Sequence, residues 1–221
     1  QQTMQQFAQV EIAGVGVISL AIKAVVTVGP ARRFLIGDPT IQLIDALAGE
    51  TLYRLATGEH SAERGEVLLD EPAVAVLGEH IEVQDWRKDS ESGERFAVVS
   101  RLKVEVEPDL WPTLDADALS DDLPPIYDRL MSGVGEFLTE LRPTVALFLR
   151  FSGIDYDGDP ESQTKLNTYL QAVQRILARY DSYMLQLTIG DKGSNFYISF
   201  GAPLAHEDDA IRAVRAALEL R

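Results

Sequence analysis

The turn at residues 190–194 groups side chains that could bind a ligand. Its sequence, Gly190-Asp-Lys-Gly-Ser194, places an acidic and a basic side chain next to each other between two expected strands. The GxxxxGK[ST] spacing of a phosphate-binding loop is absent, so a hairpin turn accounts for the glycines. Lys192 can still reach a phosphate or a carboxylate. Arg32 and Arg33 form the best local basic pair for an anion, with solvent exposure as the competing interpretation.

A second acidic group resembles the start of a calcium loop. Asp155, Asp157 and Asp159 alternate as in an EF-hand. That loop needs Gly at its sixth position and Glu at its twelfth, where this chain has Pro160 and Leu166. We therefore expect these carboxylates to cap the helix that begins at Pro160. The histidines at 60, 80 and 206 lack metal-ligand spacing, so we expect surface or capping roles for them.

Composition excludes several classes of function. The 221 residues include 20 basic and 35 acidic side chains, a net charge of −15. That charge repels phosphate backbones and anionic lipids, so we expect no nucleic-acid partner. Because the chain has no cysteine, disulfide scaffolds, zinc–cysteine sites and iron–sulfur clusters are excluded. Charges interrupt every apolar stretch before the roughly 20 residues of a membrane span, and we expect a cytoplasmic protein.

Hydrophobic patterning divides the chain into three regions. Residues 1–106 combine short apolar segments with one helical pattern: strands at 19–28, 33–36 and 66–69, helical spacing from 44 to 56, a short helix at 73–77 and a hairpin of 81–85 with 96–106. Residues 107–142 are an acidic linker followed by a connecting helix that Pro124-Pro125 opens. Residues 143–221 are the most regular: strand 145–151, helix 163–180, strands 183–189 and 196–200, and helix 208–220. This order predicts an α+β, ferredoxin-like sandwich.

The third region resembles the class III nucleotidyl cyclase family. Its run RPTVALFLRFSG at 142–153 is similar to that family's opening strand, which normally ends in Phe-x-Asp-x-x-Gly. Tyr180, IGD at 189–191 and FGAP at 200–203 resemble the family's central hairpin. HEDDA at 206–210 and RAV at 212–214 resemble the helix after it. The resemblance implies that residues 143–221 are the N-terminal half of a cyclase-like domain.

Residues 1–106 resemble the C-terminal half of such a domain. The similar stretches are KAVVTVG at 23–29, RRFLIGDP at 32–39, LAG at 47–49 and AERGEVLL at 62–69. The Gly-Asp-Pro loop looks closest to tandem, soluble adenylate cyclases. The two halves would then follow each other in permuted order, in what looks like a piece of a longer protein. They could join within one chain, exchange between two chains as a swapped dimer, or each pair with its own missing half.

The resemblance also implies a metal site. Family members use two carboxylates to hold two divalent ions, so Mg or Mn is implied for the parent protein. Asp191 matches one carboxylate, whereas Arg150 occupies the position of the other and would pair with Asp191. The residues that serve the transition state and the base are also replaced, at Tyr53, Thr57, Leu185 and Leu187. Arg54, one residue from Tyr53, would point elsewhere because a helix turns about 100° per residue.

These residues imply a part of an adenylate or guanylate cyclase-like signalling protein. The reaction would convert ATP to cyclic AMP and pyrophosphate if the parent is active, with this chain contributing the halves of a degenerate site and inactive alone. The alternative is a catalytically silent cyclase homology module that binds a regulator or dimerises. An unrelated α+β interaction domain is the third interpretation. The implied partners are the missing half-domains, a second copy of the chain, and a nucleotide or small anionic regulator.

Overall fold

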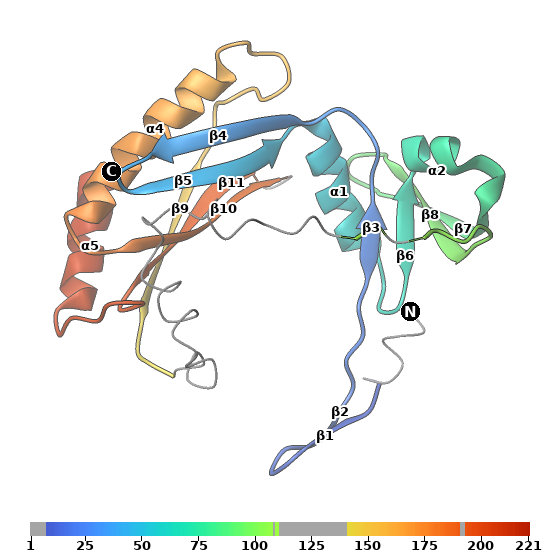
Figure 1. Cartoon of the computed structure of the whole chain (residues 1–221), viewed down its shortest axis with the longest axis horizontal. Helices are drawn as coiled ribbons and strands as arrows, with labels where there is room; N and C mark the ends of the chain where they lie inside the picture. The colour runs from blue at the N-terminus through green and yellow to red at the C-terminus, as the bar shows by residue number, and fades with distance from the viewer. Residues whose placement is uncertain (1–7, 108, 111–140, 191–192) are drawn as a thin grey trace.

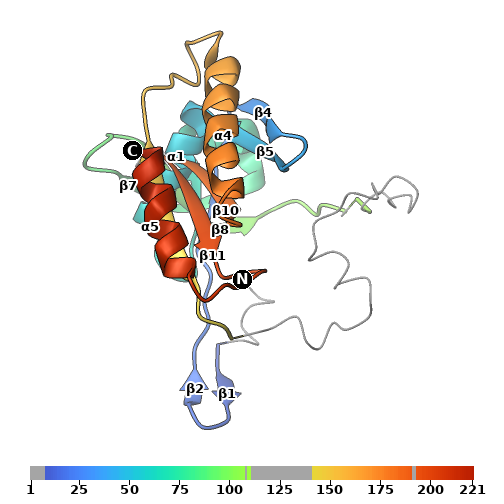
Figure 2. The ribbon, with the colours of Figure 1, turned by 90° about the vertical axis from the view of Figure 1, so that its left-hand side faces the viewer.

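The computed structural model describes residues 8–107, 109–110, 141–190 and 193–221 (Figure 1). A three-stranded antiparallel sheet forms the centre of its larger part. Strands β9 (Val145–Phe151) and β10 (Tyr183–Gly190) flank β11 (Gly193–Phe200). Helices α4 (Ser162–Ala178) and α5 (Asp209–Leu220) pack on one side of this sheet (Figure 2). The apolar stripe of α4 is buried there, with Leu166, Leu170, Val173 and Leu177.

A hairpin from the first region completes the same core. Strands β4 (Arg32–Asp38) and β5 (Gln42–Ala48) pair antiparallel, and β4 lies along α4. Phe34 and Ile36 alternate with exposed residues on β4, and both are buried in one cluster with the apolar residues of α4 and β11. The hydrophobic core therefore contains residues from both sides of the 107–142 segment.

Buried amide side chains fix this hairpin to α4. Gln174 is almost fully buried, accepts a hydrogen bond from the Asp38 amide at 2.8 Å and donates to the Gln42 carbonyl at 2.7 Å. The Asn167 side chain accepts from the Gly37 amide at 2.8 Å. Gly37 has φ of 119°, and a Cβ there would lie 2.2 Å from the Gln42 carbonyl oxygen, so only glycine fits. One helix face thus satisfies the backbone of both strands.

A four-stranded mixed sheet forms the second part of the molecule. Its order is β3 (Ala24–Val26), β6 (Val67–Asp70), β8 (Arg95–Leu102) and β7 (Ile81–Lys88). Helices α1 (Glu50–Ser61) and α2 (Glu71–Leu77) pack on it, and a short 3-10 helix, η2 (Gly78–His80), precedes β7. Because α1 also contacts β5 and β10, it links the two parts.

A small hairpin extends from the N-terminal side of the molecule. Strands β1 (Val10–Ile12) and β2 (Gly16–Ile18) pair antiparallel and project away from α4 and α5 (Figure 1). This hairpin was not expected from the sequence. Among the described residues, no helix is both long and apolar enough to cross a membrane.

The α+β class is confirmed, and two local expectations are wrong. The predicted β9, α4, β10–β11 hairpin, α5 and β7–β8 hairpin all form within a few residues of the expected bounds. Residues 44–48, expected to begin a helix, belong to β5 because Ile44, Ala46 and Ala48 alternate toward the core. Only Ala24–Val26 of the expected strand 19–28 is paired. The predicted connecting helix lies outside the described residues, and the permuted cyclase-like order stays a prediction.

Neighbouring residues on β4 provide a test of the shared core. Phe34→Ala removes a side chain that is 2% exposed, and we expect a loss of about 3–5 kcal/mol in the free energy of unfolding. Leu35→Ala is the control because Leu35 is 62% exposed on the opposite face, and we expect little change. Urea unfolding followed by circular dichroism measures both. Equal effects of the two substitutions would contradict the burial of this hairpin.

Candidate functional site

The end of β9 brings Arg150 beside the start of β11. Arg150 pairs with Asn195 across the sheet, and a Cβ on Gly193 would lie 3.5 Å from Arg150 Nε. Gly190, the last residue of β10, pairs with Gly193. Asp191 and Lys192 lie outside the described residues. Their metal- and anion-binding roles therefore stay predictions, as does an ion pair between Arg150 and Asp191.

The side chain at the end of β9 is a guanidinium and not a carboxylate that could bind a metal ion. The guanidinium of Arg150 is a cation with no lone pair to offer a metal ion. Within the described ranges, no group of three or more His, Cys, Asp or Glu side chains is placed to hold a metal ion. We call the region around Arg150, Gly190 and Gly193 the corner, and the positive charge of Arg150 opposes a divalent cation there.

The loop after β9 uses its carboxylates to hold backbone amides. Asp155 accepts from the Asp157 and Gly158 amides at 3.1 and 2.8 Å. Asp159 accepts from the Glu161 amide at 2.8 Å just before α4, and its hydrogen bond with Lys165 is the largest cause that lowers the pKa of Asp159. Glu161 is the N-cap of α4 and no side-chain hydrogen bond caps this helix. Asp159 therefore holds the residue before the helix, and the expectation that these carboxylates cap the helix is wrong.

Asp157 instead caps a helix from the other region. Its Oδ2 accepts from the Glu50 amide at 2.9 Å, at the first residue of α1. The approach depends on Gly49, whose φ is 122° and where a Cβ would lie 2.7 Å from Asp157 Oδ1. A carboxylate at a helix N-terminus is stabilised by the unpaired amides and the helix dipole. No local spacing in the sequence indicates this cap, because the two residues are 107 positions apart.

Arg32 holds the same loop from β4. Its guanidinium donates to the Asp157 carbonyl at 2.7 Å, to the Asp159 carbonyl at 2.8 Å and to Ser162 Oγ at 3.0 Å. Three protein acceptors thus surround the group that we predicted to bind an anion. Anion binding by Arg32 stays a prediction, and the contacts give this side chain a structural role.

Arg33 points to the other, exposed face of β4. It binds Asp45 of β5 with two nitrogens, at 2.5–3.0 Å. The hydrogen bond from Arg33 is the largest cause that lowers the pKa of Asp45. Arg32 and Arg33 therefore lie on opposite faces of the strand and do not form one basic pair.

Two tyrosines that the sequence analysis did not single out as ligands lie at this corner. Tyr156 is buried, and its hydroxyl is 2.8 Å from Ser194 Oγ near the start of β11. Burial raises the pKa of Tyr53, and so do the carboxylates of Asp157, Glu50 and Asp155. Tyr53 therefore stays protonated and can act as a hydrogen-bond donor. The one signal for Tyr53 in the sequence was its position, because it replaces a residue of the late helix in the family that the chain resembles.

Arg54 serves the second part of the molecule. Its Nε lies 3.0 Å from Asp70 Oδ2, and its Nη2 donates to the Val28 carbonyl at 3.0 Å. Asp70 is fully buried and also accepts from the Ala73 amide at 2.9 Å, at the start of α2. This guanidinium therefore faces the β3–β6 sheet, as the helical rotation predicted.

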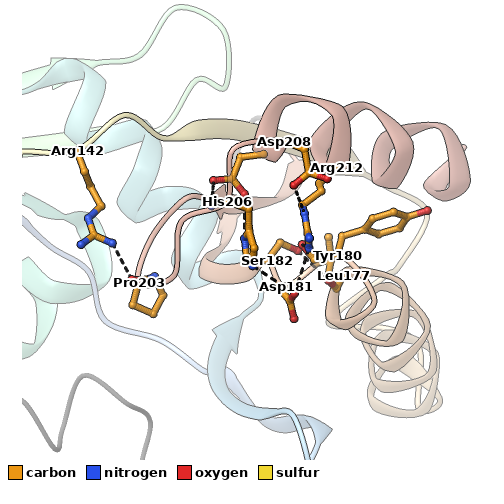
Figure 3. A network of polar contacts seen from close by, with 10 residues as sticks. Arg142, Leu177, Tyr180, Asp181, Ser182, Pro203, His206, Asp208 and Arg212 are labelled. Carbon is orange, nitrogen blue, oxygen red and sulfur yellow. Dashed lines mark hydrogen bonds and ion pairs between the residues drawn. The ribbon is translucent and has the colours of Figure 1, made fainter.

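The charged residues of the 206–212 segment join α5 to the turn between α4 and β10 (Figure 3). His206 lies 3.3 Å from Asp209 and 3.6 Å from Asp181. Arg212 binds Asp208 at 2.7 Å and Asp181 at 3.0 Å. The hydrogen bond from Arg212 is the largest cause that lowers the pKa of Asp208. These contacts join the beginning of α5 to the turn between α4 and β10. The His206 ring contacts two carboxylates and does not cap α5, whose N-cap residue is Asp208.

Arg32 and Arg33 form a matched pair of test positions. Arg32→Met removes three hydrogen bonds and leaves carbonyls without their donor, so we expect a loss of about 1–3 kcal/mol in the free energy of unfolding. Arg33→Met removes an exposed ion pair, and we expect a much smaller effect. Thermal and urea unfolding measure both changes. A larger effect at Arg33 would contradict the structural role of Arg32.

Comparison with known proteins gives a limited likeness. No protein-family model matches the chain, and no curated protein matches it. Among solved structures, the guanylate cyclase domain of RhGC from Catenaria anguillulae, in complex with GTP, is similar at 18% identity and a TM-score of 0.31. The likeness covers 35% of this chain and spans 43% of the length of that one.

Proposed function

We propose that this chain contributes the degenerate-site halves of a class III cyclase-like signalling protein and does not turn over nucleotide by itself. The positions of the family-like stretches in the fold support this proposal. The opening-strand stretch contains β9, the hairpin stretches contain the ends of β10 and β11, and the HEDDA stretch leads into α5. Each stretch thus lies on the kind of element that the resemblance implies.

The observation that carries the proposal is Arg150 at the end of β9. In the cyclase reaction the 3′-oxygen attacks the α-phosphorus, the bond to the β-phosphate breaks and pyrophosphate leaves. Divalent metal ions supply the charge neutralisation that this step needs. A fixed positive charge beside Gly193 opposes a divalent ion at this place. A pair of divalent metal ions therefore does not fit the described residues at this place.

The corner around Arg150 has features that suit a regulatory anion or nucleotide. Arg150 supplies a positive charge, and Lys192, two residues beyond Gly190, is the further candidate. The half-buried Tyr53 supplies a neutral donor. The alternative proposal, a silent homology module for regulator binding or dimerisation, uses the same observation. Under both proposals the chain acts by binding a regulator or a partner and not by catalysis.

Restoring the missing carboxylate tests this proposal. We expect no cyclic nucleotide from the purified chain with Mn²⁺ and either ATP or GTP, and no Mn²⁺ bound at this site by electron paramagnetic resonance. Arg150→Asp should create Mn²⁺ binding because it provides the second carboxylate, and Asp191→Ala in that background should remove it again. Arg101→Asp on β8 is the control, since it changes the net charge equally at an exposed position in the other sheet.

Two results would contradict the proposal. One is cyclic-nucleotide formation by the unaltered chain that Asp191→Ala abolishes. The other is Arg150→Asp behaving like Arg101→Asp in Mn²⁺ binding, because the position would then have no metal-site character.

A further inference from the structure

The N-terminal hairpin exposes apolar side chains that soluble proteins normally cover. We call residues 8–22 the arm; they contain β1, β2 and the segment that leads to β3. Val15 and Val17 are 72% and 67% exposed, and Ile12, Leu20 and Ile22 are exposed as well. The arm contains a single charged residue, Glu11, in a chain of which 25% of the residues are charged. Such a segment is typical of an interaction surface.

Strand β9 offers a surface that could receive this arm. In the part of the chain that the structure describes, β9 is an edge strand with β11 as its one hydrogen-bonded neighbour. Edge strands expose backbone amides and carbonyls that pair readily with another strand. Phe148 on β9 is 69% exposed and stacks on Tyr197 of β11, with ring centroids 4.9 Å apart. The receiving surface thus combines free backbone groups with an exposed aromatic platform.

The charges of the two surfaces are complementary. The one charged residue of β9 is Arg150, and the one charged residue of the arm is Glu11. A chain with a net charge of −15 repels its own copies over most of its surface. The arm and β9 can therefore meet without bringing acidic surfaces together.

We propose that the arm binds β9 of a second copy of this chain by strand addition. The arm projects away from the body that contains α4 and α5 (Figure 1), and its backbone would extend the β10–β11–β9 sheet by pairing with the open edge of β9. Alternate arm side chains then fall on the face that carries Phe148 and Arg150. Because each copy has one arm and one β9, the exchange closes into a two-fold dimer.

This inference deepens the dimerisation alternative of the proposed function by naming the two surfaces that pair, and it does not depend on a nucleotide or metal at the candidate site. Its consequence for the candidate site is direct, since β9 ends beside that site at Arg150. The arm of one copy would then lie next to the candidate site of the other.

Native mass in solution provides the first test. We expect the full chain to form a concentration-dependent dimer by light scattering, and Val17→Asp to convert it to monomer because a charge would enter the apolar contact. Val76→Asp is the matched control, since Val76 is 70% exposed on α2 and belongs to neither surface. Circular dichroism of each variant shows whether it is folded. A monomer at every concentration, or a dimer that both variants leave unchanged, would overturn the proposal.

Cross-linking then identifies the contact. The chain has no cysteine, so a bismaleimide joins introduced thiols alone. A Val17→Cys copy mixed with a mass-tagged Ala146→Cys copy should give a cross-linked product of one copy of each kind. Val76→Cys with the same Ala146→Cys copy is the control. Equal yields from the two mixtures, or cross-linking only within a single chain that carries both thiols, would overturn the proposal.

Discussion

The hydrogen bonds of one buried glutamine hold the two regions of this chain together. Gln174 of α4 bonds to backbone groups of both β4 and β5, and the Asn167 amide oxygen satisfies a further amide of the same hairpin. Burying these polar groups without partners would cost several kcal/mol, so their pairing selects one position of the hairpin on the helix. The placement of Phe34 and Ile36 in the core depends on that position.

The candidate site depends on the same docking. Once β4 lies along α4, Arg32 reaches the loop after β9, and Gly49 at the end of β5 brings the first amide of α1 to Asp157. These contacts set the corner where β9 ends at Arg150 and where Tyr53 and Tyr156 lie near the acidic loop. The corner is thus built by residues from both sides of the 107–142 segment, and Arg150 of β9 brings a positive charge to it.

Periodicity predicted the elements with strong patterns and missed those with weak ones. The alternation in VALFLRF and the apolar stripe of α4 were sufficient for β9 and α4. Residues 44–48 carry apolar side chains that suit either a helix or a strand over so short a segment, and the positive φ of Gly49 separates β5 from α1. Contacts between residues far apart in the sequence could not be predicted from local spacing. The Asp157 cap on α1 and the acceptors of Arg32 join residues more than 100 positions apart, so spacing favoured a helix cap and an anion site instead.

Native-state hydrogen exchange tests the shared core most directly. The amides of Gly37 and Asp38 bond to side chains of α4, whereas those of Phe196 and Ile198 lie in the centre of β11. If the hairpin and the sheet form one cooperative unit, all four amides exchange through openings of equal free energy. Rapid exchange at Gly37 and Asp38, with β11 still protected, would show that the hairpin opens separately and would contradict a single core.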